Sequence, residues 1–278
     1  MSRAHTPTIG VFDSGFGGLT VLRALIDRVP GARFAFLGDT ARLPYGSKSR
    51  RTISRYAAQS AQFLVREQGA EFLVIACNTA SALALDAIRD AVTVPVLGVI
   101  EPGAATARAT SQSGDVLVIA TDATVQSHAY AAACHARGLR ALEKACPLLV
   151  PLVEEGWTNH HVTAEVLRIY LDELLAHAAD EGLNPDALVL GCTHYPLLRP
   201  LIELTIAGGT GAGMRVIDSA ESTAEVAAHM LPSGIARAPG SEPEIHCFAT
   251  DSVEKFQRLG SKFLGLPVGT VELVDLGG

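Results

Sequence analysis

Short apolar runs that end in glycine, proline or polar residues recur along the chain and predict buried strands. They lack the polar alternation of a half-exposed strand, which is typical of parallel strands covered on both faces. The runs occupy residues 8–12, 34–37, 72–76, 95–99, 116–120, 187–190, 215–217 and 245–248.

Between these runs, apolar residues recur at the spacing of one helix face. The two clearest sets are Ile53, Tyr56, Ala57, Ala61 and Leu64, and Val166, Ile169, Tyr170 and Leu174. Strands that alternate with helices predict the α/β class, with mostly parallel sheets flanked by helices.

Two stretches rich in glycine or proline, 98–103 and 207–213, are candidate hinges. We expect a first α/β lobe from residues 1–98 plus 212–278 and a second from 99–211, because the last piece is small for an independent domain. An approximate internal repeat supports two lobes. Residues 72–79 and 187–194 each combine an apolar strand, a small residue, a cysteine and a threonine within two positions.

Composition narrows the function classes. With 48% apolar and 18% charged residues, the chain of 278 residues has enough apolar content for a large packed core. No apolar stretch reaches the roughly 18 residues of a membrane span, and no secretory signal is recognisable, so we expect a cytoplasmic protein. A net charge of −7 and 5% aromatic residues disfavour nucleic acid and favour a small-molecule partner. The sequence leaves open whether the chain forms a homodimer.

The basic residues and cysteines restrict the chemistry. Only four of the 22 basic residues are lysines, and none follows a predicted strand, which disfavours a pyridoxal phosphate aldimine and favours chemistry without a cofactor. Five cysteines without a CxxC pair fit neither a disulfide scaffold nor a zinc ribbon. We assign Cys134, Cys146 and Cys247 to packing and interpret Cys77 and Cys192 as reactive thiols.

Polar clusters follow several predicted strands, where the ligand site of a parallel sheet lies. The candidate residues are Asp13, Ser14, Tyr45, Gly46, Cys77, Asn78, Thr79, Cys192, Thr193 and His194. The glycines at 15, 17 and 18 predict a tight turn that presents Asp13 and Ser14. A dinucleotide site is disfavoured, because Thr20 replaces the third small residue and Asp13 would oppose a pyrophosphate.

Three chemistries can use these side chains. Asp13, Cys77, Cys192 and His194 are acceptable zinc ligands, although their spacing is unspecific. A single cysteine nucleophile could form a thioester, which leaves the second cysteine unexplained. Two-base proton exchange uses both thiols, because inversion of a stereocentre removes a proton from one face and delivers one to the other.

For proton exchange we expect each cysteine to precede a helix N-terminus that lowers its pKa. Asp13 and His194 are the acid-base partners, and Glu154 is a candidate helper. Facing lobes with one cysteine each would form the active site in the cleft between them. The alternative to an enzyme is a non-catalytic module that binds an amino acid. Unreactive thiols at Cys77 and Cys192 would indicate such a module.

At these residues the chain resembles the cofactor-independent glutamate racemases. The matching stretches are 10–15 with 17–19, 38–40 with 44–46, 76–80, 151–156, 190–197 and 217–220. The resemblance implies two pseudosymmetric α/β lobes, with the C-terminal segment returning to the first lobe. It also implies supply of D-glutamate for bacterial peptidoglycan.

The resemblance further assigns roles to the candidate residues. Cys77 and Cys192 would exchange the α proton with help from Asp13 and His194. The residues implied to hold glutamate are Ser14, Tyr45, Gly46, Asn78, Thr79 and Thr193. One departure is Ala120, where these enzymes usually have glycine, next to Thr121 and Thr124. Racemisation of another small amino acid such as aspartate is the alternative within this class.

Overall fold

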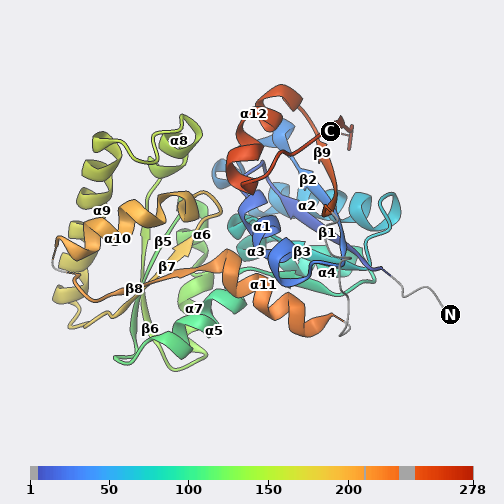
Figure 1. Cartoon of the computed structure of the whole chain (residues 1–278). Coiled ribbons are helices and arrows are strands. Elements are labelled where there is room, and N and C mark those ends of the chain that lie inside the picture. Colours follow the sequence, from blue (N-terminus) through green and yellow to red (C-terminus); the bar gives the residue numbers. More distant parts are fainter. Residues whose placement is uncertain (1–5, 210, 232–241, 278) are drawn as a thin grey trace. The chain divides into compact units, whose positions relative to one another are not determined.

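The computed structural model describes residues 6–209, 211–231 and 242–277, and the chain divides into two compact units (Figure 1). Unit 1 comprises Met1–Val99 and Thr223–Gly278, and unit 2 comprises Ile100–Ser222. Each unit has its own parallel sheet flanked by helices, which confirms the predicted fold class. Within the described ranges, no helix combines the length and apolar character needed to cross a membrane.

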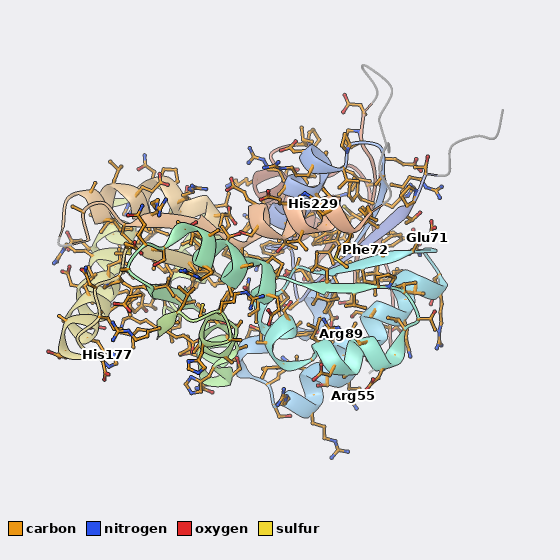
Figure 2. All side chains as sticks on the ribbon, turned by 90° about the horizontal axis from the view of Figure 1, so that it is seen from below. Arg55, Glu71, Phe72, Arg89, His177 and His229 are labelled. Carbon is orange, nitrogen blue, oxygen red and sulfur yellow. The ribbon has the colours of Figure 1, made fainter. Side chains whose placement is uncertain are left out.

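Unit 1 contains a six-stranded parallel sheet in the order β10-β9-β2-β1-β3-β4. Its strands are β1 (Thr8–Asp13), β2 (Arg33–Gly38), β3 (Phe72–Ile75), β4 (Val96–Gly98), β9 (Glu244–Ala249) and β10 (Val271–Leu273). Its helices are α1 (Leu19–Arg28), η1 (Thr40–Arg42), η2 (Tyr45–Ser47), α2 (Arg50–Arg66), α3 (Asn78–Leu83), α4 (Leu85–Ala91) and α12 (Val253–Leu264). Arg55 on α2 and Arg89 on α4, labelled in Figure 2, lie on exposed positions of their helices.

The C-terminal segment completes this sheet. In Figure 1 the red β9 lies beside the blue β2, and the two strands pair in parallel up to Gly38 and Ala249. Helix α12 holds the segment in place through aromatic contacts. Phe16 meets Phe256 and Phe263 edge to face, with ring centroids 6.4 and 5.5 Å apart.

Unit 2 contains a four-stranded parallel sheet in the order β6-β5-β7-β8. Its strands are β5 (Asp115–Ala120), β6 (Arg140–Ala145), β7 (Ala187–Gly191) and β8 (Arg215–Asp218). Its helices are α5 (Ile100–Thr110), α6 (Asp122–Ser127), α7 (Ala129–His135), α8 (Leu149–Glu154), α9 (His161–Asp180), η3 (Tyr195–Leu198) and α10 (Arg199–Ala207), and α11 (Ser219–Met230) follows β8. The order β6-β5-β7-β8 repeats the order β2-β1-β3-β4 of unit 1. Cys77 and Cys192 therefore follow corresponding strands, β3 and β7.

All eight strands predicted from apolar runs are present, whereas β6 and β10 are missed by that criterion. Both missed strands lie at the edge of their sheets. The first residue of β6 is exposed and the other five are half-buried, and two of the three residues of β10 are exposed. Edge strands with solvent on one side need no continuous apolar run, so the pattern does not reveal them.

The division of the chain differs from the predicted one at its second crossing. Strand β8 pairs with β7, so residues 215–218 belong to the second sheet rather than to the first lobe. The crossing lies within α11, between Ser222 and Thr223, and not in the glycine-rich stretch 207–213, which begins at the last residue of α10 and precedes β8. Apolar spacing also overstates one burial, because Ile169 on α9 is 49% exposed.

Candidate functional site

Cys77 has a fixed position at the carboxyl end of β3. The strand ends at Ile75, and Cys77 forms the N-cap of α3. Its sulfur accepts a hydrogen bond from the backbone N–H of Ala80 at 3.4 Å, and its thiol donates to the hydroxyl oxygen of Ser14 at 3.4 Å. The side chain is buried. These contacts connect the thiol to the loop that follows β1.

Asp13 ends β1, the strand that pairs with β3, and it is buried. Its Oδ2 accepts a hydrogen bond from the backbone N–H of Gly15 at 2.9 Å. The predicted glycine turn packs closely on this carboxylate. A Cβ at position 18 would lie 2.6 Å from the Asp13 Cβ and 2.8 Å from the Ala76 Cβ, so only Gly18 fits without a shift.

The surroundings of Cys77 favour the protonated thiol. Burial, followed by the negative charge of Asp13, raises its pKa to about 12. The hydrogen bonds with Ser14 and Ala80 lower the pKa but are outweighed. The prediction that a helix N-terminus lowers the pKa of this thiol is therefore wrong in its net direction, because the sequence does not reveal the burial of the sulfur.

Tyr45 and Gly46 lie in η2, and Asn78 and Thr79 begin α3, which contacts η2. Tyr45, Asn78 and Thr79 are all buried. The Tyr45 phenol donates a hydrogen bond to Asp39 Oδ2 at 2.6 Å, and this bond is buried in unit 1. A Cβ at position 46 would meet no atom within 4 Å. The backbone of this turn is therefore the part that can approach a ligand.

In unit 2, Cys192 directly follows β7 and is buried. Its sulfur lies 3.9 Å from His194 Nδ1, and the Thr193 hydroxyl lies 3.4 Å from the same nitrogen. The other ring nitrogen, Nε2, lies 3.3 Å from Glu154 Oε1 on α8. The expected helix N-terminus does not directly follow this cysteine, because the 3₁₀ turn η3 begins only at Tyr195.

The charge state of His194 is set by its two neighbours. Burial alone lowers its pKa, but hydrogen bonds with Cys192 and Glu154, together with their negative charges, outweigh that effect and raise the pKa from 6.5 to about 10. The imidazolium form is therefore favoured at neutral pH. Glu154 on Nε2 also fixes the ring with Nδ1 toward the sulfur.

The structure gathers the predicted residues into two clusters, one in each unit. The unit 1 cluster contains Asp13, Ser14, Tyr45, Gly46, Cys77, Asn78 and Thr79, and the unit 2 cluster contains Cys192, Thr193, His194 and Glu154. Thr121 and Thr124, which follow β5, pair through their hydroxyl groups at 3.0 Å. Among the described residues, no group of three or more His, Cys, Asp or Glu side chains is arranged to hold a metal ion.

Sequence reasoning assigned no role to Asp39, which is fully buried and bonded to Tyr45. Its polar stretch with Gly38 and Thr40 after β2 was a visible signal. Its partner Thr250 lies 211 positions away, and no local pattern connects the two residues.

Comparison with known proteins gives consistent results. A model of the Asp/Glu/Hydantoin racemase family matches residues 9–227. A glutamate racemase of Koribacter versatilis is 52% identical over the full length of both chains.

Solved structures agree with these matches. The glutamate racemase isoform RacE1 of Bacillus anthracis superposes with a TM-score of 0.85 and 35% identity over 99% of each chain. A glutamate racemase of Francisella tularensis in complex with D-glutamate gives a TM-score of 0.84 and 36% identity over 98% of each chain.

Proposed function

Because the chain belongs to the Asp/Glu/Hydantoin racemase family and is an amino-acid racemase, we propose that it interconverts L- and D-glutamate with Cys77 and Cys192 as its two bases. The observation that carries this proposal is the pair of cysteines after β3 and β7, the corresponding strands of two sheets with the same order. Glutamate is favoured over other amino acids because the Koribacter versatilis glutamate racemase is 52% identical over the full length of both chains, and the B. anthracis and F. tularensis glutamate racemases superpose over nearly the whole chain.

The proposed reaction moves one proton on and one proton off the α-carbon, and no cofactor takes part. A thiolate on one face removes the α proton and becomes a thiol, and the bonding electron pair stays on the substrate as a carbanion conjugated with its carboxylate. The thiol on the other face then delivers its proton to the α-carbon and becomes a thiolate. The reverse reaction exchanges the two roles, so a single pair of cysteines serves both directions.

The two clusters place different charges next to the two sulfurs. Burial and Asp13 favour the protonated thiol at Cys77, since its pKa is raised to about 12. The charge next to Cys192 is positive instead, since imidazolium His194, held by Glu154, has its Nδ1 3.9 Å from that sulfur. After one conversion, the sulfur that gained the α proton releases a proton to solvent and the sulfur that gave one takes a proton from solvent, which restores the starting state.

We propose that uncharged donors hold the substrate. Ser14, Asn78, Thr79 and Thr193 offer hydroxyl and amide groups, and the turn at Tyr45 and Gly46 offers backbone N–H groups. Fixed donors of this kind stabilise negative charge as it develops on the substrate, with less solvent reorganisation than free water requires.

As part of the same proposal, the enzyme acts in the cytoplasm and supplies D-glutamate for peptidoglycan. Expression of the chain should restore growth of a bacterium that requires external D-glutamate, and a Cys77→Ala variant should not. Light scattering of the purified chain tests the homodimer that the sequence leaves open.

The substrate assignment is tested with purified protein and a panel of L-amino acids, with products separated by chiral chromatography. We expect D-glutamate to form from L-glutamate, with much slower turnover of aspartate. Turnover of aspartate in preference to glutamate would reassign the substrate within the family, and no turnover of any member of the panel would overturn the proposal.

A further inference from the structure

A buried carboxylate that the proposed proton transfer does not use holds the turn at Tyr45. Asp39 follows β2 and is 0% exposed. Its Oδ2 accepts a hydrogen bond from the Tyr45 phenol at 2.6 Å, and its Oδ1 accepts one from the Thr250 hydroxyl at 2.9 Å. Hydrogen bonds to an ionised acceptor are stronger than neutral ones, so both contacts constrain the side chains that make them.

We propose that Asp39 is a positioning residue that sets the backbone of Tyr45 and Gly46 for substrate binding, acting through the Tyr45 phenol. This inference rests on the proposed function, in which that backbone holds glutamate. Tyr45 itself presents only its backbone to a ligand, because its hydroxyl is bonded to Asp39 and its ring is buried.

The phenol is a permanent donor in this arrangement. Burial, followed by the charge of Asp39, raises the pKa of Tyr45 far above its usual value, so the proton stays on the phenol. The ring also packs against two other aromatic rings, since its centroid lies 6.2 Å from that of Phe12 and 6.3 Å from that of Tyr56. The hydroxyl has little freedom to find another acceptor.

The charge of Asp39 has a partner in η1, the guanidinium of Arg42. Arg42 Nη1 lies 3.4 Å from Asp39 Oδ2, and its guanidinium stacks on the Tyr56 ring at 4.3 Å. An unpaired carboxylate would be costly at this depth, and Arg42 offsets that cost. The backbone N–H of Asp39 donates to the Asp13 carbonyl at 3.0 Å, so the same residue also connects the turn to the end of β1.

The C-terminal segment completes the support from the far end of the chain. Thr250 directly follows β9, and its backbone N–H donates to the Gly38 carbonyl at 3.2 Å. The N–H of Asp251 donates to the Thr40 hydroxyl at 2.9 Å. Gly38 and Thr40, the residues on either side of Asp39, are therefore hydrogen-bonded to the C-terminal segment. That segment thus supports the substrate-binding turn in addition to completing the sheet.

Four variants separate positioning from simple stability: Tyr45→Phe, Thr250→Val, Asp39→Ala and Asp39→Asn. Tyr56→Phe is the matched control, because it removes a hydroxyl from the neighbouring ring and leaves Asp39 unchanged. The readouts are the Kd for D-glutamate by isothermal titration calorimetry, kcat and KM for racemisation, and Tm.

We expect Tyr45→Phe to raise Kd and KM about tenfold, as the loss of one charge-assisted hydrogen bond does. We expect kcat to change by less than about threefold, because the sulfurs are untouched. Asp39→Asn retains an acceptor and should restore part of the affinity lost in Asp39→Ala. Tyr45→Phe and Thr250→Val act through one carboxylate, so their effects on Kd should be non-additive.

Unchanged Kd in Tyr45→Phe, or a loss confined to kcat, would overturn the inference. Tyr45→Phe and Thr250→Val keep it testable even if Asp39→Ala does not fold. Wild-type protein that binds no glutamate would refute the proposed function, and this inference with it. Wild-type binding combined with normal binding by Tyr45→Phe would refute the inference alone.

Discussion

Cys77 and Cys192 follow corresponding strands of two sheets with the same order, yet their nearest titratable neighbours differ in charge. Cys77 lies close enough to the carboxylate of Asp13 for that charge to raise its pKa, together with burial, to about 12. Cys192 lies 3.9 Å from His194, which favours the imidazolium form. A repeated backbone thus carries a carboxylate next to one sulfur and an imidazolium next to the other.

This difference matters for a reaction that needs an acid on one face and a base on the other. Two identical environments would start with both thiols protonated or both ionised, and neither state can remove and deliver a proton in one passage. The proposed two-base reaction needs unequal neighbours, and Asp13 beside Cys77 and His194 beside Cys192 provide them.

The largest expected effect comes from removing either sulfur. Cys77→Ala and Cys192→Ala should each reduce racemisation by at least about a thousandfold, because inversion needs both bases. Each variant should still exchange the α proton of one enantiomer with solvent, and the two variants should act on opposite enantiomers. NMR of each enantiomer in deuterium oxide measures this directly.

Cys247→Ala and Cys134→Ala are the matched controls in units 1 and 2, since both remove a buried thiol outside the two clusters. Substantial racemisation in either Cys77→Ala or Cys192→Ala would contradict the assignment of both cysteines as bases.

The next effect tests the carboxylate beside Cys77. Asp13→Asn should lower the pKa of this thiol from about 12, because a negative neighbour is lost, while burial keeps it above its ordinary value. Ser14→Ala should move the pKa in the opposite direction, since it removes a hydrogen bond that lowers it. Alkylation rates against pH, followed by mass spectrometry of the Cys77 peptide, report both shifts.

We also expect Asp13→Asn to slow racemisation about a hundredfold, as the loss of one acid-base group does. A Cys77 pKa that stays unchanged in Asp13→Asn would remove the electrostatic contrast between the two cysteines.

A smaller effect tests His194. Glu154→Gln should lower its pKa from about 10 and slow racemisation about tenfold, because the residue that orients and charges the imidazole is lost. Nitrogen chemical shifts of the imidazole measure the titration. Glu155→Gln is the control, since it removes the same charge from the next, exposed residue.

His194 also makes the free energy of unfolding depend on pH. The folded-state pKa of His194 lies above its ordinary 6.5, so its contribution to the free energy of unfolding is complete below about pH 6.5 and is lost as pH rises through about 10. Urea unfolding of wild type and His194→Asn should therefore converge at high pH. A difference that grows toward high pH would contradict the raised pKa.

The smallest effect concerns the turn beneath Asp13. Gly18→Ala would place a Cβ 2.6 Å from that of Asp13, and this overpacking should cost about 1–3 kcal/mol in the free energy of unfolding. Gly46→Ala meets no atom within 4 Å and should change stability by less than about 0.5 kcal/mol. Equal stability of the two variants in urea would show that the turn has room to relax.

The contrast between the cysteines also shows how far sequence reasoning reaches. Continuous apolar runs predict central strands such as β1, β5 and β7, because burial on both faces leaves a clear composition signal. The edge strand β6 escapes this criterion, since its residues are only half-buried. The second crossing is missed for another reason: the apolar run 215–217 does not say which sheet it joins.

Candidate site residues are predictable where they directly follow such strands, as Cys77 and Cys192 do. Their electrostatics are not, because the pKa of Cys77 depends on the depth of burial and on the distance to Asp13. Asp39 is missed as well, since its bond to Thr250 connects positions 211 residues apart.

Racemisation of L-glutamate in deuterium oxide tests the two-base reaction most directly. With purified protein, early D-glutamate should carry one α deuteron in nearly every molecule, while the remaining L-glutamate is still mostly protiated, because the proton is delivered by the second, solvent-equilibrated sulfur. D-glutamate that retains the original α proton would show that a single base returns it to the other face, and would contradict the division of roles between Cys77 and Cys192.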